Sequence, residues 1–317
     1  MMCSSKITHW IGGACAAVVL SMPVTAADVK QSLTTSSVDS PSIGYVVRTV
    51  DPDSGALELR AMLGVPGSAR FSDAIALPDG TTAAEVASGQ KWVLAIRANE
   101  AVAFQPDANV TTSIARIGTP TAWAFSPSGS RAALFYPDRG NVVLWSGLPG
   151  TPKLESTLRI AQMDSFAISD NGAFVYSAGG RILDSGGGLV YTTGGTMAFE
   201  AGRDLIVLYD DANSTLVEVP VTGGSNRIIA SGFDAPDQLL AGADRIYTAN
   251  FAAGKVSLVE YADGSLSRQD VKVSRLSQSA IRGTVLVSFD TNDPAWLVSS
   301  QGLSFVPAIV SQQQGVQ

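Results

Sequence analysis

The sequence predicts an all-β fold made of repeated four-stranded units, and three observations support this. Short runs of Val, Ile, Leu, Phe and Tyr alternate, from Ile43 to about Val310, with turns of Gly, Asp, Asn, Pro and Ser. Strong helix formers are scarce, with 21 aspartates against 7 glutamates and only 6 lysines. The same pattern of runs recurs along the chain, which favours one repeat architecture over two separate domains.

The clearest unit lies between residues 121 and 158. Its four predicted strands, joined by tight turns, are Thr121–Phe125, Arg131–Tyr136, Asn141–Trp145 and Lys153–Leu158. Comparable first strands begin at Ala74, Ser165, Thr196, Gln238 and near Val273, at spacings of 31 to 47 residues. This period is close to the ~40–50 residues of a propeller blade, whereas a sandwich would need long crossovers between its sheets. The sequence therefore predicts a single-domain β-propeller.

The number of blades depends on an additional hairpin at the N-terminus. Tyr45–Val50 and Leu57–Leu63 form two strands through a turn at residues 51–55. This pair either completes the last blade or starts a seventh, so the alternatives are six and seven four-stranded blades. We expect seven, closed between the chain termini, because an open ring would expose edge strands. The one candidate helical turn is Thr82–Ser88.

The first 27 residues have the features of a secretory signal peptide. Lys6 supplies a positive charge, Trp10–Leu20 is apolar, and Val24–Ala26 provides small residues for cleavage after Ala26 or Ala27. An uncleaved anchor is the alternative, but the apolar run is shorter than the ~20 residues that span a bilayer. We expect an exported, periplasmic or extracellular protein. Its predicted organisation is signal peptide 1–27, flexible linker 28–42, propeller 43–310 and disordered tail 311–317, with no membrane span after cleavage.

The composition excludes several kinds of chemistry. The only His and both Cys are His9, Cys3 and Cys15, all inside the predicted signal peptide. After cleavage the chain would lack imidazole and thiol groups, which excludes Ser-His-Asp and Cys-His catalysis and zinc sites built on these residues. The net charge of −7 and the lack of a Lys/Arg run argue against nucleic-acid binding.

The candidate site consists of three aspartates. Asp73, Asp164 and Asp237 each stand immediately before a predicted first strand, in loops that converge at the rim of a propeller's central channel. Three carboxylates there would provide an oxygen-only site suited to Ca²⁺ or Mg²⁺, and they could raise one another's pKa to give a general base. The alternative is that each aspartate braces a turn, as aspartates commonly do. We assign no metal on this basis, with Ca²⁺ as the cation to test.

Several other patterns have simpler structural explanations. Asp210-Asp211 and Asp290–Asp293 are acidic turns without the spacing of an EF-hand loop. The glycines between Gly179 and Gly195 lack the Gly-Lys-Ser/Thr sequence of a phosphate loop. Ser88–Lys91 and Ser169–Asn171 match two of the three β-lactamase motifs by spacing, but the third is absent. The tryptophans expected to pack between blades are Trp92, Trp123, Trp145 and Trp296.

Three segments resemble known propeller repeats. Ile246–Val259, with a strand ending in Asn250, a Gly254 turn and a returning Val256-Ser-Leu-Val strand, resembles the YVTN family of bacterial β-propellers. Residues 125–129 and 168–172 are similar to the Ser-Pro-Asp-Gly turn of TolB-like propellers. The matches lie in the repeated region from about 70 to 308. They imply the architecture and say little about activity, because many functions share this scaffold.

Two functions from different classes follow from these patterns. The first is an exported, non-catalytic propeller that binds a protein, an envelope component or another ligand. The second is a Ca²⁺-dependent lactonase or hydrolase of the gluconolactonase-like type. That family's Glu–Asn–Asp ligand set has no traceable equivalent here, so we expect the binding scaffold. The sequence does not predict an oligomeric state.

Overall fold

The computed structural model describes residues 42–51, 53–65, 68–232, 234–242, 245–261, 264–270, 273, 275–278, 284–288, 295–299 and 302–306. The predicted signal peptide, nearly all of the predicted linker, and the predicted tail lie outside these residues, and so do residues 307–310 of the predicted propeller.

Almost every described residue belongs to a strand or to a turn between strands. One short 3₁₀ helix, η1 (Pro137–Arg139), interrupts this pattern. The six four-stranded sheets are β4–β7 (Ala83–Val86, Val93–Arg97, Glu100–Gln105, Val110–Ala115), β8–β11 (Ala122–Phe125, Ala132–Tyr136, Asn141–Ser146, Lys153–Arg159), β12–β15 (Ser165–Ile168, Phe174–Ala178, Arg181–Asp184, Leu189–Tyr191), β16–β19 (Met197–Phe199, Leu205–Asp210, Thr215–Pro220, Arg227–Ser231), β20–β23 (Gln238–Ala241, Arg245–Asn250, Lys255–Glu260, Leu266–Asp270) and β24–β27 (Arg275–Gln278, Thr284–Ser288, Ala295–Ser299, Gly302–Val306). A further sheet contains β1 (Ser42–Asp51), β2 (Ala56–Leu63) and β3 (Arg70–Phe71).

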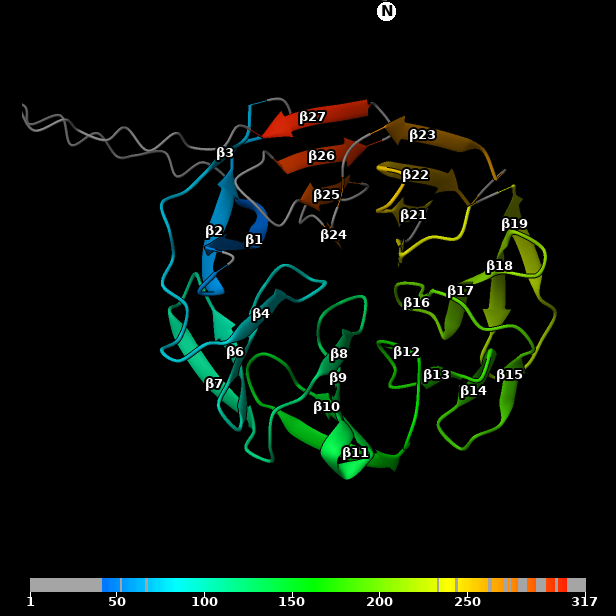
Figure 1. Cartoon of the computed structure of the whole chain (residues 1–317), viewed down its shortest axis with the longest axis horizontal. Coiled ribbons are helices and arrows are strands. Elements are labelled where there is room, and N and C mark those ends of the chain that lie inside the picture. The colour runs from blue at the N-terminus through cyan, green and yellow to red at the C-terminus, as the bar shows by residue number, and fades with distance from the viewer. Residues whose placement is uncertain are drawn as a thin grey trace, which may run out of the picture. The chain divides into compact units, whose positions relative to one another are not determined.

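The sheets follow one another around a common axis (Figure 1). Every sheet is an antiparallel meander whose strands pair in chain order. In the four-stranded sheets the first strand is innermost and the fourth is outermost, and neighbouring innermost strands such as β12, β16 and β20 contact each other. This arrangement is a β-propeller with six four-stranded blades, which confirms the predicted fold class.

The structure confirms most of the predicted first strands. β8, β12, β16 and β20 begin within one residue of the predicted positions, and β24 begins at Arg275, close to Val273. The N-terminal hairpin is also observed, as β1 and β2. It does not complete the last blade, because β24–β27 already has four strands. It starts a separate sheet of three described strands, so a seventh four-stranded blade is not seen.

Two local predictions are wrong, and they have one cause. The segment that begins at Ala74 is not a first strand, because Ile75 forms a β-bridge with Leu59 of β2. The first strand of that blade is β4, which lies inside the segment Thr82–Ser88 that was the candidate helical turn. β4 pairs along its whole length with β5, from Ala83 opposite Ile96 to Val86 opposite Val93. Cross-strand pairing therefore overrides the weak local helix signal.

The hydrophobic core lies between adjacent sheets. The largest cluster joins β4–β7 to β8–β11, and Trp92 in it is 1% exposed. Trp92 meets the ring of Phe125 edge-on, with centroids 5.3 Å apart, and its indole N–H donates to the carbonyl of Gly129 at 2.8 Å. Trp123 and Trp145 pack against the same cluster, as predicted. Burying aromatic area between sheets stabilises their packing, and satisfying the indole N–H avoids the cost of an unpaired buried donor.

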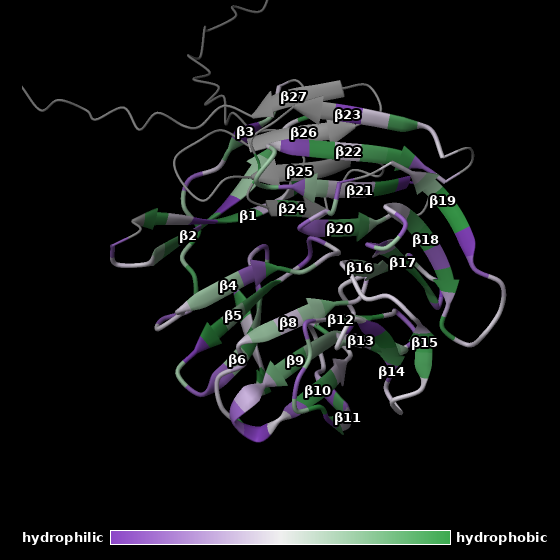
Figure 2. Ribbon diagram, turned by 45° about the vertical axis from the view of Figure 1, so that its right-hand side comes forward, coloured by the Kyte–Doolittle hydropathy of each residue, from purple (hydrophilic) through white to green (hydrophobic). Residues whose placement is uncertain are grey.

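The distribution of hydrophobic and hydrophilic residues agrees with this packing. Hydrophobic residues dominate the strands, and hydrophilic residues are concentrated in the turns at the strand ends (Figure 2). In the described part of the chain, no helix has the length and hydropathy needed to cross a membrane.

Candidate functional site

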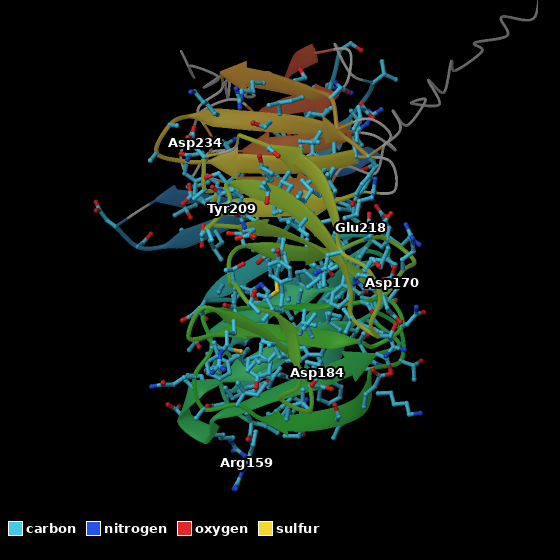
Figure 3. The ribbon with its side chains drawn as sticks, turned by 90° about the vertical axis from the view of Figure 1, so that its right-hand side faces the viewer. Arg159, Asp170, Asp184, Tyr209, Glu218 and Asp234 are labelled. Carbon is cyan, nitrogen blue, oxygen red and sulfur yellow. The ribbon has the colours of Figure 1, made fainter. Side chains whose placement is uncertain are left out.

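The strand ends form two opposite faces, which carry the polar residues considered below. The link face carries the links into the innermost strands, such as residues 160–164 and 232–237, together with the turns between second and third strands. The turn face carries the turns between first and second strands, such as residues 126–131, 169–173 and 200–204. Figure 3 shows Asp234 of the link face and Asp170 of the turn face at opposite edges of the sheets.

Asp164 and Asp237 occupy equivalent positions on the link face. Their backbone N–H groups donate to the carbonyls of Ser177 and Ala249, each at 2.8 Å, so both stand where an innermost strand begins. Both residues are exposed. Asp237 has a structural partner, because its carboxylate accepts the backbone N–H of Phe251 at 2.6 Å and so braces the turn between β21 and β22.

Asp73 is placed differently from the other two aspartates. It was selected because a first strand was expected at Ala74, and that expectation is wrong. Asp73 lies between Ser72, whose N–H donates to the carbonyl of Ala61 at 2.8 Å, and Ile75, whose N–H donates to the carbonyl of Leu59 at 2.8 Å. It therefore runs along the outer edge of β2, away from the start of an innermost strand.

The three aspartates do not form a cluster in this structure. Asp164 and Asp237 belong to sheets separated by the whole of β16–β19, and Asp73 lies on the edge of β2. Within the described ranges, no group of three His, Cys, Asp or Glu side chains is arranged to hold a metal ion. Asp290–Asp293, the second acidic turn considered in the sequence, lies outside the described residues.

Asp210, the first residue of the other acidic turn, is a buried and fully bonded carboxylate. It is 2% exposed. One oxygen accepts from Thr193 Oγ1 and the N–H of Ala212, both at 3.0 Å, and the other accepts from Tyr191 Oη at 3.1 Å and Asn213 Nδ2 at 2.8 Å. Burial opposes ionisation, but these hydrogen bonds outweigh it and hold the pKa of Asp210 below its usual value. Asp210 therefore fixes the turn after β17 and its contact with the preceding sheet.

Asp170 connects three consecutive blades on the turn face. It belongs to the Ser-Asp-Asn-Gly turn between β12 and β13. In the preceding blade, Ser128 donates to the Asp170 carboxylate through its backbone N–H at 2.9 Å and its hydroxyl at 2.6 Å. In the following blade, Gly202 donates to the same carboxylate through its backbone N–H at 3.2 Å. Burial opposes ionisation, but these bonds hold the pKa of Asp170 below its usual value.

The remaining part of the β-lactamase-like pattern also has a structural explanation. Ser169 is fully buried, and its hydroxyl oxygen accepts the N–H groups of Asn171 at 3.2 Å and Ala173 at 3.0 Å. Ser88 belongs to the turn between β4 and β5, in a blade two positions before that of Ser169. These serines are turn residues in different blades.

A second buried carboxylate lies at the interface of blades β16–β19 and β20–β23. Glu200 is 5% exposed, and Arg203 Nη1 contacts its two carboxylate oxygens at 3.2 and 3.0 Å. Nearby, Arg227 donates to Glu218 at 2.6 Å and to the carbonyl of Tyr261 at 3.2 Å. Burial raises the pKa of Glu200 despite Arg203, and the charge of Glu218 contributes in the same direction. Burial also raises the pKa of Tyr261. This network braces an interface between blades.

The glycine-rich stretch is explained by close backbone packing at the link face and by the turn between β14 and β15. A Cβ on Gly195 would lie 2.4 Å from the carbonyl oxygen of Tyr209, and one on Gly194 would lie 2.9 Å from the carbonyl carbon of Gly180. In the turn between β14 and β15, Asp184 accepts the N–H groups of Gly186 and Gly188, both at 2.8 Å. These glycines permit close approach of backbone segments.

Besides Val50 and Val65, the large aliphatic side chains that are exposed in the described ranges are five residues of outermost strands, which the sequence did not predict. Each is the first or second residue of an outermost strand, so all five lie near the turn face. They are Val110 of β7 (45% exposed), Leu154 of β11 (52%), Leu189 of β15 (58%), Ile228 of β19 (66%) and Leu266 of β23 (37%). We call these five residues the aliphatic rim. Each of them lies in the last strand of its sheet, where one edge of the strand has no neighbour in the same sheet.

Comparison with known proteins identifies the fold and no family. No protein-family model and no curated protein matches the chain. A functionally unknown protein from Desulfotomaculum acetoxidans is similar in structure, with a TM-score of 0.56, 13% identity and coverage of 86% of this chain and 96% of that one.

Two further structures show the same likeness. The β-propeller domain of Cps50 (Swd1) from Myceliophteria thermophila gives a TM-score of 0.54 at 10% identity, over 73% of this chain and 86% of that one. PorZ, an essential bacterial surface component of the type-IX secretion system of Porphyromonas gingivalis, gives 0.53 at 10% identity, over 86% of this chain. The matched region spans only 39% of the PorZ chain. At these identities the likeness shows the β-propeller fold alone.

Proposed function

We propose that this chain is an exported, non-catalytic propeller that binds a protein partner through its outermost strands. The observation that carries the proposal is the aliphatic rim, which repeats one exposed aliphatic side chain in five consecutive blades. Single exposed aliphatic residues are ordinary on a protein surface. Their recurrence near the start of the outermost strand in successive blades supports a binding surface, because a partner gains apolar contact at each of them.

The outermost strands also offer a second kind of contact. Each is the last strand of its sheet, so one edge of its backbone faces away from the blade. An extended segment of a partner can add to such an edge through main-chain hydrogen bonds, while its side chains contact the residues beside it. Ile228 in β19 and Leu189 in β15 are the two most exposed residues of the rim and lie in adjacent blades.

The polar residues of the two faces support the same proposal. Asp170, Asp210 and Glu200 are bonded within the molecule and fix turns or interfaces between blades. Export to the periplasm or the cell exterior rests on the signal-like leader. PorZ, one of the similar structures, is a bacterial surface component, which agrees with an envelope or extracellular partner.

Calcium calorimetry separates this proposal from the hydrolase alternative. Ca²⁺ is titrated into the wild-type chain and into the double variant Asp164→Ala/Asp237→Ala, after removal of bound metal with a chelator. We expect no binding heat and no Ca²⁺-dependent thermal shift in either protein, because the two carboxylates are exposed and lie in sheets separated by a whole blade. Tight binding that the double variant loses would contradict the scaffold and favour a Ca²⁺-dependent enzyme.

A further inference from the structure

The chain contains two acceptor sequences for N-glycosylation, and the structure distinguishes between them. The sequence Asn-x-Ser/Thr, in which x is any residue except Pro, begins at Asn109 and at Asn213. An Asp-Ala pair precedes both asparagines and a Thr ends both sites, so each reads Asp-Ala-Asn-x-Thr. Bacterial oligosaccharyltransferases require such an acidic residue two positions before the asparagine. The sequence alone therefore gives no reason to prefer either site.

The transfer reaction needs a free carboxamide on the acceptor asparagine. The side-chain nitrogen, Nδ2, forms a bond to the anomeric carbon of a sugar, and the bond from that carbon to an oxygen of a lipid pyrophosphate breaks. Nδ2 loses one proton, and the lipid pyrophosphate leaves with the bonding electron pair. If Nδ2 already donates to an acceptor of the folded chain, that hydrogen bond must first be broken, which costs free energy. Since the attached sugar is bulky, the site must also be exposed.

Asn109 meets these requirements. It lies in the turn between β6 and β7, and both Asn109 and Thr111 are exposed. Its backbone N–H donates to the carbonyl of Pro106 at 3.2 Å, whereas its carboxamide has no hydrogen-bond partner among the described residues. Its φ of 51° is in the left-handed region, which asparagine adopts more readily than most residues. The turn thus explains an asparagine at this position, but it does not use the side chain.

The acidic residue of this site is also accessible. Asp107 is exposed, and one of its carboxylate oxygens, Oδ1, accepts the hydroxyl of Tyr45 in β1. The other oxygen, Oδ2, accepts no hydrogen bond from the described residues. Asp107 therefore keeps one oxygen for a cationic group of a transferase.

The second site is blocked by the packing of its own turn. Asn213 Nδ2 donates to Oδ2 of Asp210 at 2.8 Å, and Asp210 is only 2% exposed. Thr215, which supplies the hydroxyl of this site, is 6% exposed. It lies in β18, which has a neighbouring strand on each side, whereas Thr111 lies in the outermost strand β7. The fold therefore engages the acceptor nitrogen of Asn213 and covers its threonine.

We propose that Asn109 carries an N-linked oligosaccharide, transferred from a lipid pyrophosphate-linked donor, and that Asn213 stays unmodified in the folded protein. The inference goes beyond partner binding, and it rests on the export that the proposed function includes. It assigns a role to the one carboxamide of the two sites that the fold leaves free.

Transfer to the purified full-length chain tests the choice of site. The folded protein is incubated with a bacterial oligosaccharyltransferase and a lipid pyrophosphate-linked oligosaccharide, and the products are mapped by peptide mass spectrometry. We expect at least about tenfold more sugar on Asn109 than on Asn213, because only Asn213 must break a hydrogen bond. In a tryptic digest of the same chain, which removes the fold, we expect both asparagines to be modified to similar extents. Equal modification in the folded chain, or no transfer to Asn109 in the folded chain or in the digest, would overturn the proposal.

Variants of the first site separate the acceptor from the turn. Asn109→Asp keeps a residue that tolerates the left-handed conformation and removes the amide nitrogen, so we expect no transfer. Thr111→Val removes the hydroxyl and keeps a β-branched side chain in β7, and it should also abolish transfer. Thr111→Ser retains the hydroxyl and serves as the matched control that is still modified. Undiminished transfer to Thr111→Val would contradict recognition of this sequence.

The protein isolated from the cells that produce it links the modification to export. Its intact mass reports removal of the leader and addition of sugar together. We expect a chain that begins after Ala26 or Ala27 and carries an oligosaccharide at Asn109. A chain without the leader and with an unmodified Asn109 would overturn this inference and leave export intact. A chain that keeps the leader and lacks the sugar would contradict both.

Discussion

The surroundings of each carboxylate in the described part of this protein decide whether it is buried and how many hydrogen bonds it accepts. Asp210 and Asp211 are adjacent in the sequence, yet Asp210 is buried with four hydrogen-bond donors and Asp211 is exposed. From the sequence both belonged to one acidic turn. The difference arises because Tyr191, in the last strand of the preceding blade, and Thr193, in the link that follows it, donate to Asp210 only after the blades pack. Contacts between blades of this kind leave no local signal in the sequence.

Replacing Asp210 tests this assignment against a neighbouring control. Asp210→Asn puts an amide N–H₂ group against several donors, so we expect the free energy of unfolding to fall by about 1–3 kcal/mol. Asp211→Asn changes an exposed side chain and should alter stability by less than about 0.5 kcal/mol. Urea unfolding of the three proteins measures both effects. Equal losses in the two variants would show that the hydrogen bonds of Asp210 contribute little.

Glu200 gives a prediction about pH. Burial raises its pKa in the folded protein, so the folded state holds the proton more tightly than the unfolded state does. Its favourable contribution is therefore complete below the ordinary glutamate pKa and is lost as the pH rises through the raised pKa. We expect the stability of the wild type relative to Glu200→Gln to fall as the pH rises above the ordinary glutamate pKa, as measured by urea unfolding. A difference that rises with pH would mean that the ion pair with Arg203 dominates.

At the scale of strands and turns, the repeat pattern correctly predicted those strands and turns that short stretches of sequence determine. The turns Ser126–Gly129 and Ser169–Gly172 are followed by apolar second strands, and both are observed where expected. The segment from Ala74 has the same pattern, with a Pro-Asp-Gly turn after it, and there the prediction failed. Its partner is β2, and a pattern along the chain does not show which strand a segment pairs with. The site prediction at Asp73 failed for the same reason.

The turns on the turn face are expected to couple neighbouring blades energetically. Asp170 accepts two hydrogen bonds from Ser128 in the preceding blade. A double-mutant cycle of Asp170→Ala and Ser128→Ala should give a coupling energy of about 0.5–3 kcal/mol. Asp164→Ala serves as the control, since Asp164 is exposed, and it should be additive with Ser128→Ala. Additivity of Asp170→Ala and Ser128→Ala in urea unfolding would show that this bond does not link the blades.

At the scale of the whole molecule, the sequence predicted the propeller but not the aliphatic rim. The fold follows from the period of strands and turns, which is local information repeated along the chain. The aliphatic rim depends on which strands lie at the outside of the ring and on which of their residues no neighbour covers. Apolar residues in short strands look alike in sequence whether they face the core or solvent, so Ile228 and the buried Ile229 cannot be distinguished there.

Position-resolved photo-crosslinking tests the central claim, that the chain binds a protein partner through the aliphatic rim. A photoreactive amino acid is placed at Leu154, Leu189 or Ile228, and for comparison at the exposed link-face residues Asp164 and Asp234, in cells that produce the protein. We predict that the rim positions crosslink to the same partner at least tenfold more strongly than the link-face positions. Ile228→Asp should reduce crosslinking from Leu189, because the two residues lie in adjacent blades. Equal crosslinking from both sets, or a partner captured only from the link face, would contradict the account.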